Sequence, residues 1–163
     1  MRLHNLRLVL AVAPTLFVSR RRRWLLTEAG RFCRSLPARL REPLPQAIAG
    51  LTPPALGGRV GPAHEAAVRD LADLAALLDR RSPLGLCLRR SLTRYYFLRR
   101  AGVPVELQFG ARLGDGRPER QLHGHAWLAL DGQPYYEEDE NWRGFKVMLA
   151  FPRDLTLPAE LGA

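Results

Sequence analysis

The stretch "HGHAWLALDGQPYYEED" (123–139) decides the fold, because two runs of strand-like character meet there at an Asp-Gly pair. Alternation with a period of two predicts β-strands that bury one face, and Asp-Gly between two such runs is a strong signal for a two-residue hairpin. We therefore predict a strand over 122–130, a turn at 131–132 and a returning strand over 133–139. The C-terminal part of the chain is then an antiparallel sheet.

Two further runs extend this sheet. In "VELQFGARL" (105–113) apolar and polar residues alternate, which predicts a strand with one buried face. The apolar run "FKVMLAF" (145–151) predicts a fourth strand. We predict that the strands follow one another along the chain as an antiparallel meander.

The residues before the sheet have a longer period, which is typical of amphipathic helices. The clearest case is "HEAAVRDLADLAALLDRR" (64–81), in which Asp70, Asp73 and Asp79 lie outside the apolar stripe. The run "LCLRRSLTRYYFLRRAG" (86–102) predicts a second helix that ends at a glycine.

Earlier in the chain, helices are predicted over 6–18 and 22–40. We expect the prolines at 37, 43 and 45 to interrupt helical structure at the end of the second helix and beyond it. The Pro- and Gly-rich run 51–63 is expected to be a linker. Because helices come first and strands second, we predict an α+β fold in which N-terminal helices are packed on an antiparallel sheet.

The charge is distributed unevenly along the 163 residues, whose formal net charge is +9. Residues 1–60 contain 11 arginines and two acidic residues, whereas residues 61–163 contain 14 basic and 14 acidic residues. We therefore separate an Arg-rich helical segment, 1–60, from a neutral domain, 61–163. Such a segment suits an acidic partner, an anionic membrane surface or nucleic acid, but a solvated helix face explains it as well.

Several classes of protein are excluded by composition. Two cysteines, 54 residues apart, make neither a disulfide framework nor a zinc-ligand spacing, so a reducing cytoplasmic location is expected. The apolar run 6–18 is shorter than the ~20 residues that span a bilayer, and we expect a buried or membrane-surface helix. The arginines at 20–23 stand where a cleavable signal would have small residues.

Cys87 is the candidate nucleophile. It opens a predicted helix, where backbone N–H groups and the helix dipole favour a thiolate, and Arg89 and Arg90 follow it. A small buried side chain is the competing interpretation for Cys87. Cys33 lies within an apolar stripe beside Phe32, and we predict that it belongs to the core.

His123 and His125 share one face of their strand with Trp127. The pair could hold a metal ion if a carboxylate joined it, but no third ligand stands at a recognisable spacing, so we expect no metal and no cofactor. A cysteine at a helix start, then a histidine on a strand, then an acid on the next strand is also the chain order of Cys–His–acid sites.

The segments "CLRRSLTRYYFLRRAGVPVELQFGAR" (87–112) and "HAWLALDGQPYYE" (125–137) resemble the B-protein leader peptidases of lasso-peptide biosynthesis. Those proteins carry a "C-L-x-R-(S/A)-L" helix start and an "H-A-W-x-x-x-D-G" hairpin in a transglutaminase-like, papain-like domain. The resemblance covers about residues 65 to 151. It implies that 61–163 is a transglutaminase-like cysteine peptidase domain.

The resemblance also implies roles for individual residues. Cys87 would be the nucleophile and His125 the base, with the orienting acid twelve positions after the histidine. That position holds Glu137 where the family has Asp. Hairpin register leaves alternatives open, because a two-residue turn places Glu138 opposite His125 and a three-residue turn places Asp139 there, while a bulge restores Glu137.

The implied substrate is a ribosomal precursor peptide that is cut after its leader. A separate leader-binding protein and an ATP-dependent cyclase would be the partners, with peripheral membrane contact possible and no nucleic acid. Two other functions compete with this one. The chain could be a non-enzymatic scaffold that docks through its basic segment, or an acyltransferase that uses the same three residues with an amine acceptor.

Overall fold

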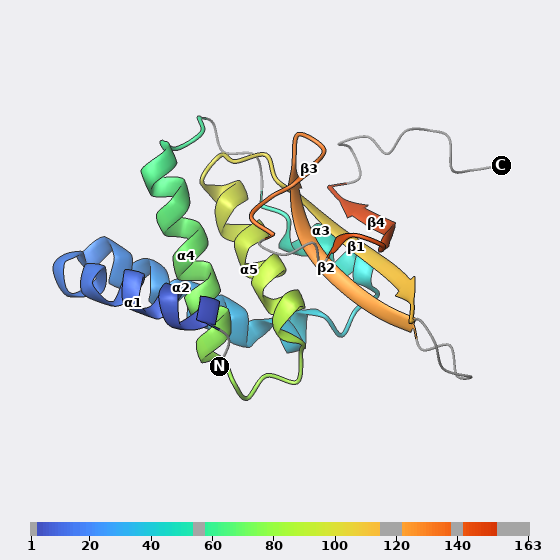
Figure 1. Cartoon of the computed structure of the whole chain (residues 1–163), viewed down its shortest axis with the longest axis horizontal. Coiled ribbons are helices and arrows are strands. Elements are labelled where there is room, and N and C mark those ends of the chain that lie inside the picture. Colours follow the sequence, from blue (N-terminus) through green and yellow to red (C-terminus); the bar gives the residue numbers. More distant parts are fainter. Residues whose placement is uncertain (1–2, 54–57, 115–121, 138–141, 153–163) are drawn as a thin grey trace. The chain divides into compact units, whose positions relative to one another are not determined.

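A computed structural model describes residues 3–53, 58–114, 122–137 and 142–152 of the chain. It divides into two compact units, a helical unit, Met1–Val103, and a sheet unit, Pro104–Ala163 (Figure 1). Within these described ranges, five helices precede four antiparallel strands. The predicted α+β class is therefore confirmed.

The helical unit contains α1 (Leu3–Val18), α2 (Arg20–Arg39), α3 (Leu44–Leu51), α4 (Pro62–Leu78) and α5 (Leu86–Arg100). Helix α3 is absent from the sequence-based prediction, which treated Pro43 and Pro45 as breaks. They stand at the start of α3, where the first N–H groups of a helix have no partner within it, so a residue that lacks an N–H fits there.

The core of this unit lies where α2, α4 and α5 meet, and Figure 1 shows α4 and α5 side by side. Phe32 of α2 stacks on Tyr96 of α5, with ring centroids 4.3 Å apart, and meets Phe97 edge-on. The predicted apolar stripe of α4 is buried at Val68, Leu71, Leu74 and Ala75, whereas Leu78 at its end is 63% exposed.

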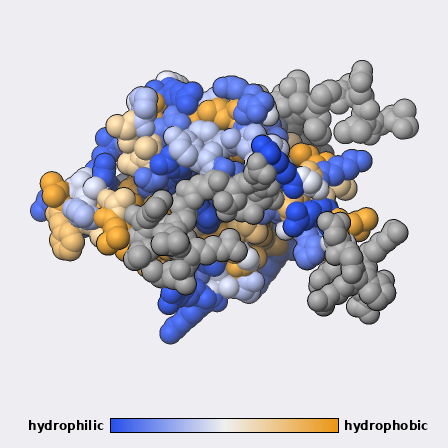
Figure 2. Space-filling view, in the orientation of Figure 1, coloured by the Kyte–Doolittle hydropathy of each residue, from blue (hydrophilic) through white to orange (hydrophobic). Residues whose placement is uncertain are grey.

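Helix α1 buries only part of its apolar surface. Leu8 and Val12 are buried, whereas Phe17 and Val18 are 85% and 89% exposed. Figure 2 shows this apolar surface around the corner between α1 and α2. None of the helices in the described part of the chain has both the length and the apolar character that a bilayer span requires.

Asp73 of α4 lies outside the apolar stripe and is nevertheless 3% exposed. Its carboxylate pairs with Arg94 of α5, which is buried as well, and with Arg90 Nη2 at 2.9 Å. Burying a charge is costly unless it is paired and hydrogen-bonded, and two guanidinium groups meet that condition here. The cluster joins α5 to α4 along the first half of α5.

The variant Asp73→Asn is expected to lower the free energy of unfolding by about 3–5 kcal/mol, because the buried Arg94 cation loses its carboxylate. Asp70→Asn on the same helix is the matched control. Asp70 pairs with Arg69 near the surface, where such a pair contributes under ~1 kcal/mol. Urea denaturation of both variants measures the difference, and equal losses would contradict a special role for Asp73.

The same cluster makes stability depend on acid. Burial acts to raise the pKa of Asp73, but Arg94 and Arg90 lower it by more, so its pKa lies below its ordinary value. Asp73 therefore stabilises the fold fully above the ordinary Asp pKa of about 3.9, and this contribution is lost as the pH falls through the folded-state pKa. In Asp73→Asn this part of the acid dependence should disappear.

The sheet unit contains β1 (Glu106–Leu113), β2 (Leu122–Leu130), β3 (Gln133–Pro134) and β4 (Lys146–Phe151). The strand order is β3-β2-β1-β4, with all pairs antiparallel. The predicted meander is therefore wrong for the last strand, because β4 pairs with β1 and not with β3. Strand β3 has only two residues and offers little edge for another strand.

The hairpin between β2 and β3 has the predicted two-residue turn. Leu130 pairs with Gln133, and Asp131 and Gly132 both have positive φ, at 52° and 74°, as a type I′ turn requires. The returning strand is shorter than predicted: it ends at Pro134, although the Tyr135 N–H still donates to the Leu128 carbonyl oxygen at 2.8 Å. Beyond it Tyr136 adopts a φ of 53°, so the chain leaves the extended conformation.

Candidate active site

Cys87 is the second residue of α5 and is half-buried. Gly85 precedes the helix as its N-cap and supplies no side chain to bond the N–H groups of the first turn. These groups carry partial positive charge, so the start of α5 suits a thiolate or an oxyanion. The local setting predicted for Cys87, at a helix start after a Pro- and Gly-containing turn, is confirmed.

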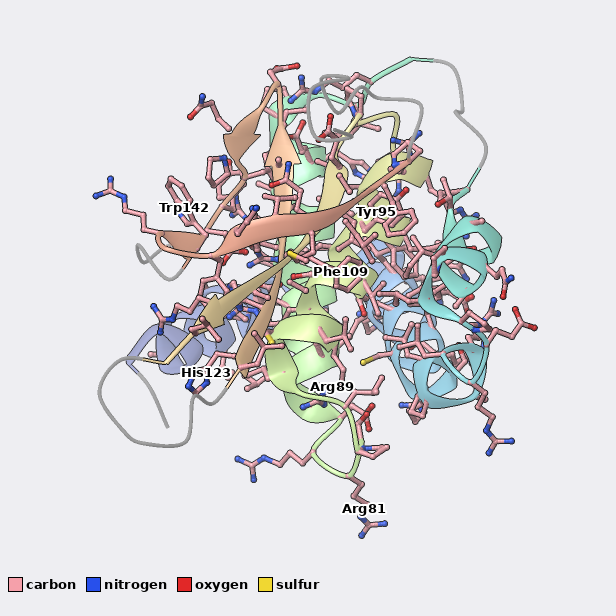
Figure 3. The ribbon with its side chains drawn as sticks, turned by 90° about the vertical axis from the view of Figure 1, so that its right-hand side faces the viewer. Arg81, Arg89, Tyr95, Phe109, His123 and Trp142 are labelled. Atoms are coloured by element: carbon pink, nitrogen blue, oxygen red, sulfur yellow. The ribbon has the colours of Figure 1, made fainter. Side chains whose placement is uncertain are left out.

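Two arginines after Cys87 fix the start of α5 on α4. Arg89 Nη1 donates to the carbonyl oxygen of Ala76 at 2.8 Å and also to that of Asp79. Arg89 is buried between the helices, whereas Arg81 extends outward from the preceding turn (Figure 3). Arg90 adds little positive potential near the thiol, because its charge is compensated by Asp73.

Cys33 differs from Cys87 in every respect that matters for reactivity. Its side chain is fully buried, which confirms the core position predicted for it. The thiol donates to Asp79 Oδ2 at 3.7 Å. Burial raises the pKa of Cys33, and the nearby carboxylate of Asp79 raises it further. Cys33 is therefore held as a thiol.

In the sheet unit the structure brings His125 and Glu137 together. The ring nitrogen Nε2 of His125 lies 3.8 Å from Glu137 Oε2, and both side chains are largely shielded from solvent. The contact depends on the positive φ of Tyr136, since the chain turns there instead of continuing along β2. The straight-hairpin register that pointed to Glu138 therefore does not apply, and Glu138 and Asp139 lie outside the described residues.

A separation of 3.8 Å makes this contact an ion pair when the imidazole is protonated, but it is longer than a hydrogen bond. Catalytic contacts are often long in enzymes without bound substrate and shorten in the substrate complex. The arrangement engages Nε2, so proton transfer by this ring would use its other nitrogen, Nδ1. It can orient an imidazole and stabilise it when it accepts a proton.

Aromatic rings enclose His125 on its own strand face. Trp127 stacks on the imidazole, with centroids 5.7 Å apart and planes 19° apart, and Phe145 lies at 5.4 Å. Gly110 is opposite His125 on β1, and a Cβ there would lie 2.6 Å from the Trp127 ring. The glycine is therefore required for the indole to lie flat beside the histidine.

Sequence reasoning missed Gly110 and Phe145. A glycine in the middle of an alternating strand was the available signal, because it often marks the close approach of another group. Phe145 precedes β4, and its place beside His125 depends on β4 pairing with β1. Arg112 adds a cation 4.7 Å from the centre of the Phe145 ring.

His123 is exposed, two residues before His125 on the same strand, as expected for a residue outside the reaction. Within the described ranges, no group of three His, Cys, Asp or Glu side chains is placed to bind a metal ion. The Cys87 setting belongs to the helical unit and the His125–Glu137 pair to the sheet unit.

Comparison with known proteins gives one match. The profile of a family described as the Transglutaminase-like superfamily matches residues 8–150. The match includes Cys87, His125 and Glu137 and most of the Arg-rich segment. No curated protein and no solved structure matches the chain.

Proposed function

This chain belongs to the transglutaminase-like superfamily, and on that premise we propose that it is a cysteine peptidase that removes the leader of a lasso-peptide precursor. The superfamily includes cysteine peptidases and acyltransferases. The step to leader removal is supported by the resemblance of residues 87–112 and 125–137 to the B-protein leader peptidases.

The observation that carries the proposal is the contact between His125 Nε2 and Glu137 Oε2, at 3.8 Å. An imidazole that is fixed by a carboxylate through one nitrogen can act as a base through the other. With Cys87 at a helix start as the nucleophile, these residues supply a thiol, a base and an orienting acid. This is the set that acyl transfer requires.

In the proposed reaction, His125 Nδ1 accepts the thiol proton of Cys87, and the thiolate attacks the carbonyl carbon of the scissile peptide bond. The resulting oxyanion accepts a hydrogen bond from the Cys87 backbone N–H. The imidazolium then gives its proton to the leaving nitrogen, which departs as the amino terminus of the core peptide. The leader remains as a thioester on Cys87.

Water completes the cycle. His125 accepts a proton from water while the hydroxide oxygen attacks the thioester carbonyl, and the thiol leaves with that proton. The products are the leader with a new carboxylate and the regenerated enzyme. Glu137 acts throughout by stabilising the imidazolium form of His125.

The test is incubation of the protein with a precursor peptide and its leader-binding protein, followed by mass spectrometry. Hydrolysis adds one water across the cut bond and supports the peptidase. A leader product that carries a supplied amine in place of water identifies an acyltransferase. Intact precursor, together with a Cys87 that iodoacetamide does not modify, contradicts both enzymes and leaves a docking scaffold.

The variant Gly110→Ala tests whether the aromatic enclosure positions His125. The added methyl group would lie 2.6 Å from the Trp127 ring and 3.0 Å from Phe145 Cβ, so the indole must move. We expect the cleavage rate to fall by about tenfold to a hundredfold, since displacing a catalytic group by ~1 Å has effects of that size. Steady-state kinetics measures the change in kcat against KM.

Gly124→Ala is the matched control. Gly124 lies on the same strand as His125, and a Cβ added there would have no atom within 4 Å. Its rate should equal that of the wild type. Thermal unfolding separates the two contributions in Gly110→Ala, where overpacking also costs about 1–3 kcal/mol. A lower melting temperature with an unchanged kcat would show that Trp127 supports the fold without positioning the histidine.

A further inference from the structure

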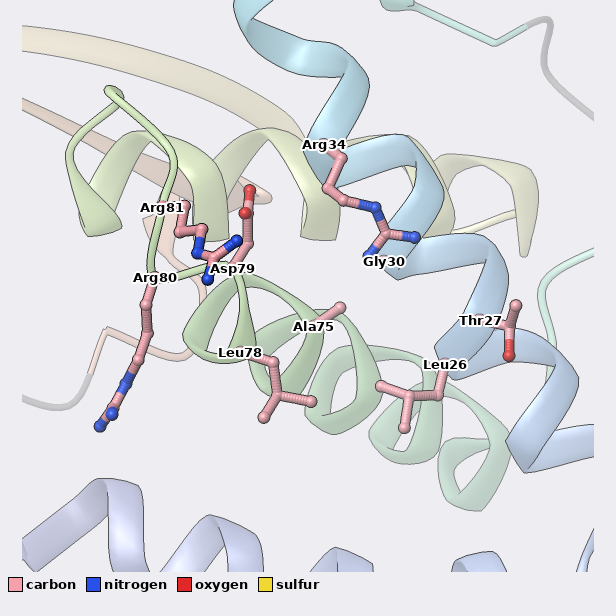
Figure 4. A pocket seen from close by; sticks show the side chains of 9 residues that line it. All are labelled: Leu26, Thr27, Gly30, Arg34, Ala75, Leu78, Asp79, Arg80 and Arg81. Atoms are coloured by element: carbon pink, nitrogen blue, oxygen red, sulfur yellow. The ribbon is translucent and has the colours of Figure 1, made fainter.

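A groove of about 630 Å³ lies between α2 and α4 in the helical unit (Figure 4). Figure 4 shows Leu26 of α2 and Leu78 of α4 pointing toward one another across it. The volume is in the range of sites that bind small molecules or short peptide segments. Its lining residues are Leu26, Thr27, Gly30, Arg34, Ala75, Leu78, Asp79, Arg80 and Arg81.

The groove combines the facing aliphatic side chains of Leu26 and Leu78 with a cationic rim. Arg34, Arg80 and Arg81 are all exposed, and none of them takes part in an ion pair with another described residue. Asp79 is the single carboxylate of the lining, and it accepts a hydrogen bond from the Cys33 thiol. With three arginines and one aspartate, the lining therefore keeps a net positive charge.

We propose that this groove binds an acidic segment of a peptide, with its carboxylates on the arginine rim and an aliphatic side chain between Leu26 and Leu78. Arginine binds carboxylates through two parallel N–H donors, which makes it suited to this recognition. On the function proposed above, the occupant is an acidic part of the precursor peptide, and this identification rests on that function.

The lining favours a peptide over other anionic partners. Among the described residues, no aromatic ring lines the groove, so nucleobases would find no surface there on which to stack, which single-stranded nucleic-acid sites usually provide. Leu26 and Leu78 face one another across a concave surface (Figure 4), whereas a membrane-surface helix needs a continuous face of protruding apolar side chains. An acidic peptide matches both the charge and the concavity.

One end of the groove lies beside the start of α5. Arg80 and Arg81 follow Asp79, the C-cap of α4, and Cys87 comes six residues after Arg81. The hydrogen bonds from Arg89 to Ala76 and Asp79 hold the first turn of α5 against this end of α4. Arg89, two residues after Cys87, therefore lies against Asp79 at one end of the groove.

The binding test uses the full-length Cys87→Ala protein, so that no turnover disturbs the equilibrium. Fluorescence anisotropy compares a labelled Glu- and Leu-containing peptide with the same peptide carrying Gln in place of Glu. The acidic peptide should bind at least about tenfold more tightly and lose affinity as salt is added. Equal affinities for the two peptides would overturn the proposal.

Charge reversal locates the site. Arg34→Glu and Arg81→Glu should each weaken binding of the acidic peptide by about tenfold or more, since each replaces attraction by repulsion. Arg41→Glu is the matched control, because Arg41 is an exposed arginine of the same unit outside the groove. An equal loss in the control would show a general effect of net charge and would contradict a groove.

The variant Gly30→Leu places a side chain in the groove without destabilising α2. Gly30 lies within α2, and a Cβ there would meet only the Arg34 guanidinium, at 3.4 Å. Replacing glycine inside a helix favours helix formation, so the melting temperature should stay level or rise. Peptide binding should weaken by at least about tenfold, whereas Gly50→Leu, with open space around it, should bind as the wild type does.

Measuring cleavage of the precursor distinguishes the groove proposal from the peptidase proposal. If Gly30→Leu and Arg81→Glu, made with Cys87 intact, raise KM and leave kcat unchanged, the groove is a substrate site of the peptidase. If both variants cleave the precursor with wild-type KM, the groove assignment is overturned and the peptidase stands. If the acidic peptide binds the groove but wild-type protein cleaves nothing, the groove stands and the peptidase falls.

Discussion

Replacing Cys87 by alanine is expected to abolish cleavage of the precursor, with a loss of about four orders of magnitude or more, while leaving the fold intact. The thiol is the only group in the proposed mechanism that forms a bond to the substrate. Losing the nucleophile of such a set commonly costs as much as losing the whole set. Mass spectrometry of the products and a thermal unfolding curve measure the two halves of this prediction.

The fold should survive, because Cys87 is half-buried at the second position of α5 and the helix start is held by other residues. Arg89 bonds two carbonyl oxygens of α4 and its following residue, and Arg90 pairs with Asp73. None of these contacts involves the thiol. An unfolded Cys87→Ala protein would show that the side chain is structural.

Cys33→Ala is the matched control, since it removes the other thiol of the chain. Its side chain is fully buried against α4 and α5, so the change should lower stability and leave the rate per folded molecule near that of the wild type. Iodoacetamide should label Cys87 in the wild type and spare Cys33, whose pKa is raised by burial. Continued turnover by Cys87→Ala would refute the peptidase.

The hairpin could be predicted because its signal is local. Asp131 and Gly132 are among the few residues that tolerate positive φ, and both adopt it. The alternation on either side then determines which residues pair, so Leu130 meets Gln133 as predicted. Helices α4 and α5 were predictable for the same reason, since their periods are visible within single segments.

Features that depend on distant partners could not be predicted. Asp73 lies off the apolar stripe of α4, and a helix taken alone would place it in solvent. It is buried because Arg90 and Arg94 arrive from α5, 17 and 21 residues later. Likewise Pro43 is compatible both with a break in the chain and with the start of a helix. The helix start is favoured because α3 buries Ile48, which is a tertiary contact that the local sequence does not show.

The candidate site shows the same division. His125 and Trp127 share a strand face by local alternation, whereas Phe145 joins them through the pairing of β4 with β1. The choice of acid depended on the path of the chain after Tyr135, the last residue that bonds β2. The positive φ of Tyr136 lies directly before Glu137, which contacts the ring, and strand patterns do not encode it.

Glu137→Gln is expected to lower kcat by about a hundredfold to ten-thousandfold with little change in melting temperature. Glutamine keeps the shape of the side chain but cannot stabilise the imidazolium, and its amide can turn the histidine into the wrong tautomer. The starting point is the 3.8 Å contact with His125 Nε2. The rate and the pH profile of kcat should both change, because the carboxylate influences the proton affinity of the ring.

Asp131→Asn is the matched control for this change of charge. Asp131 lies in the same hairpin, is exposed and has a positive φ that asparagine also tolerates, so neither the rate nor the fold should alter. A loss in this variant as large as in Glu137→Gln would mean that the sheet unit needs negative charge in general and not an acid beside His125.

A double-mutant cycle separates a positioning role from an independent one. If Glu137 acts only through the imidazole, then Glu137→Gln should have almost no further effect in a protein that already carries His125→Ala. His125→Ala alone should cost about three orders of magnitude or more, since the thiol at neutral pH is mostly protonated without a base. Additive losses would show that Glu137 contacts the substrate directly, and the Cys–His–acid triad would reduce to a Cys–His dyad with a separate binding carboxylate.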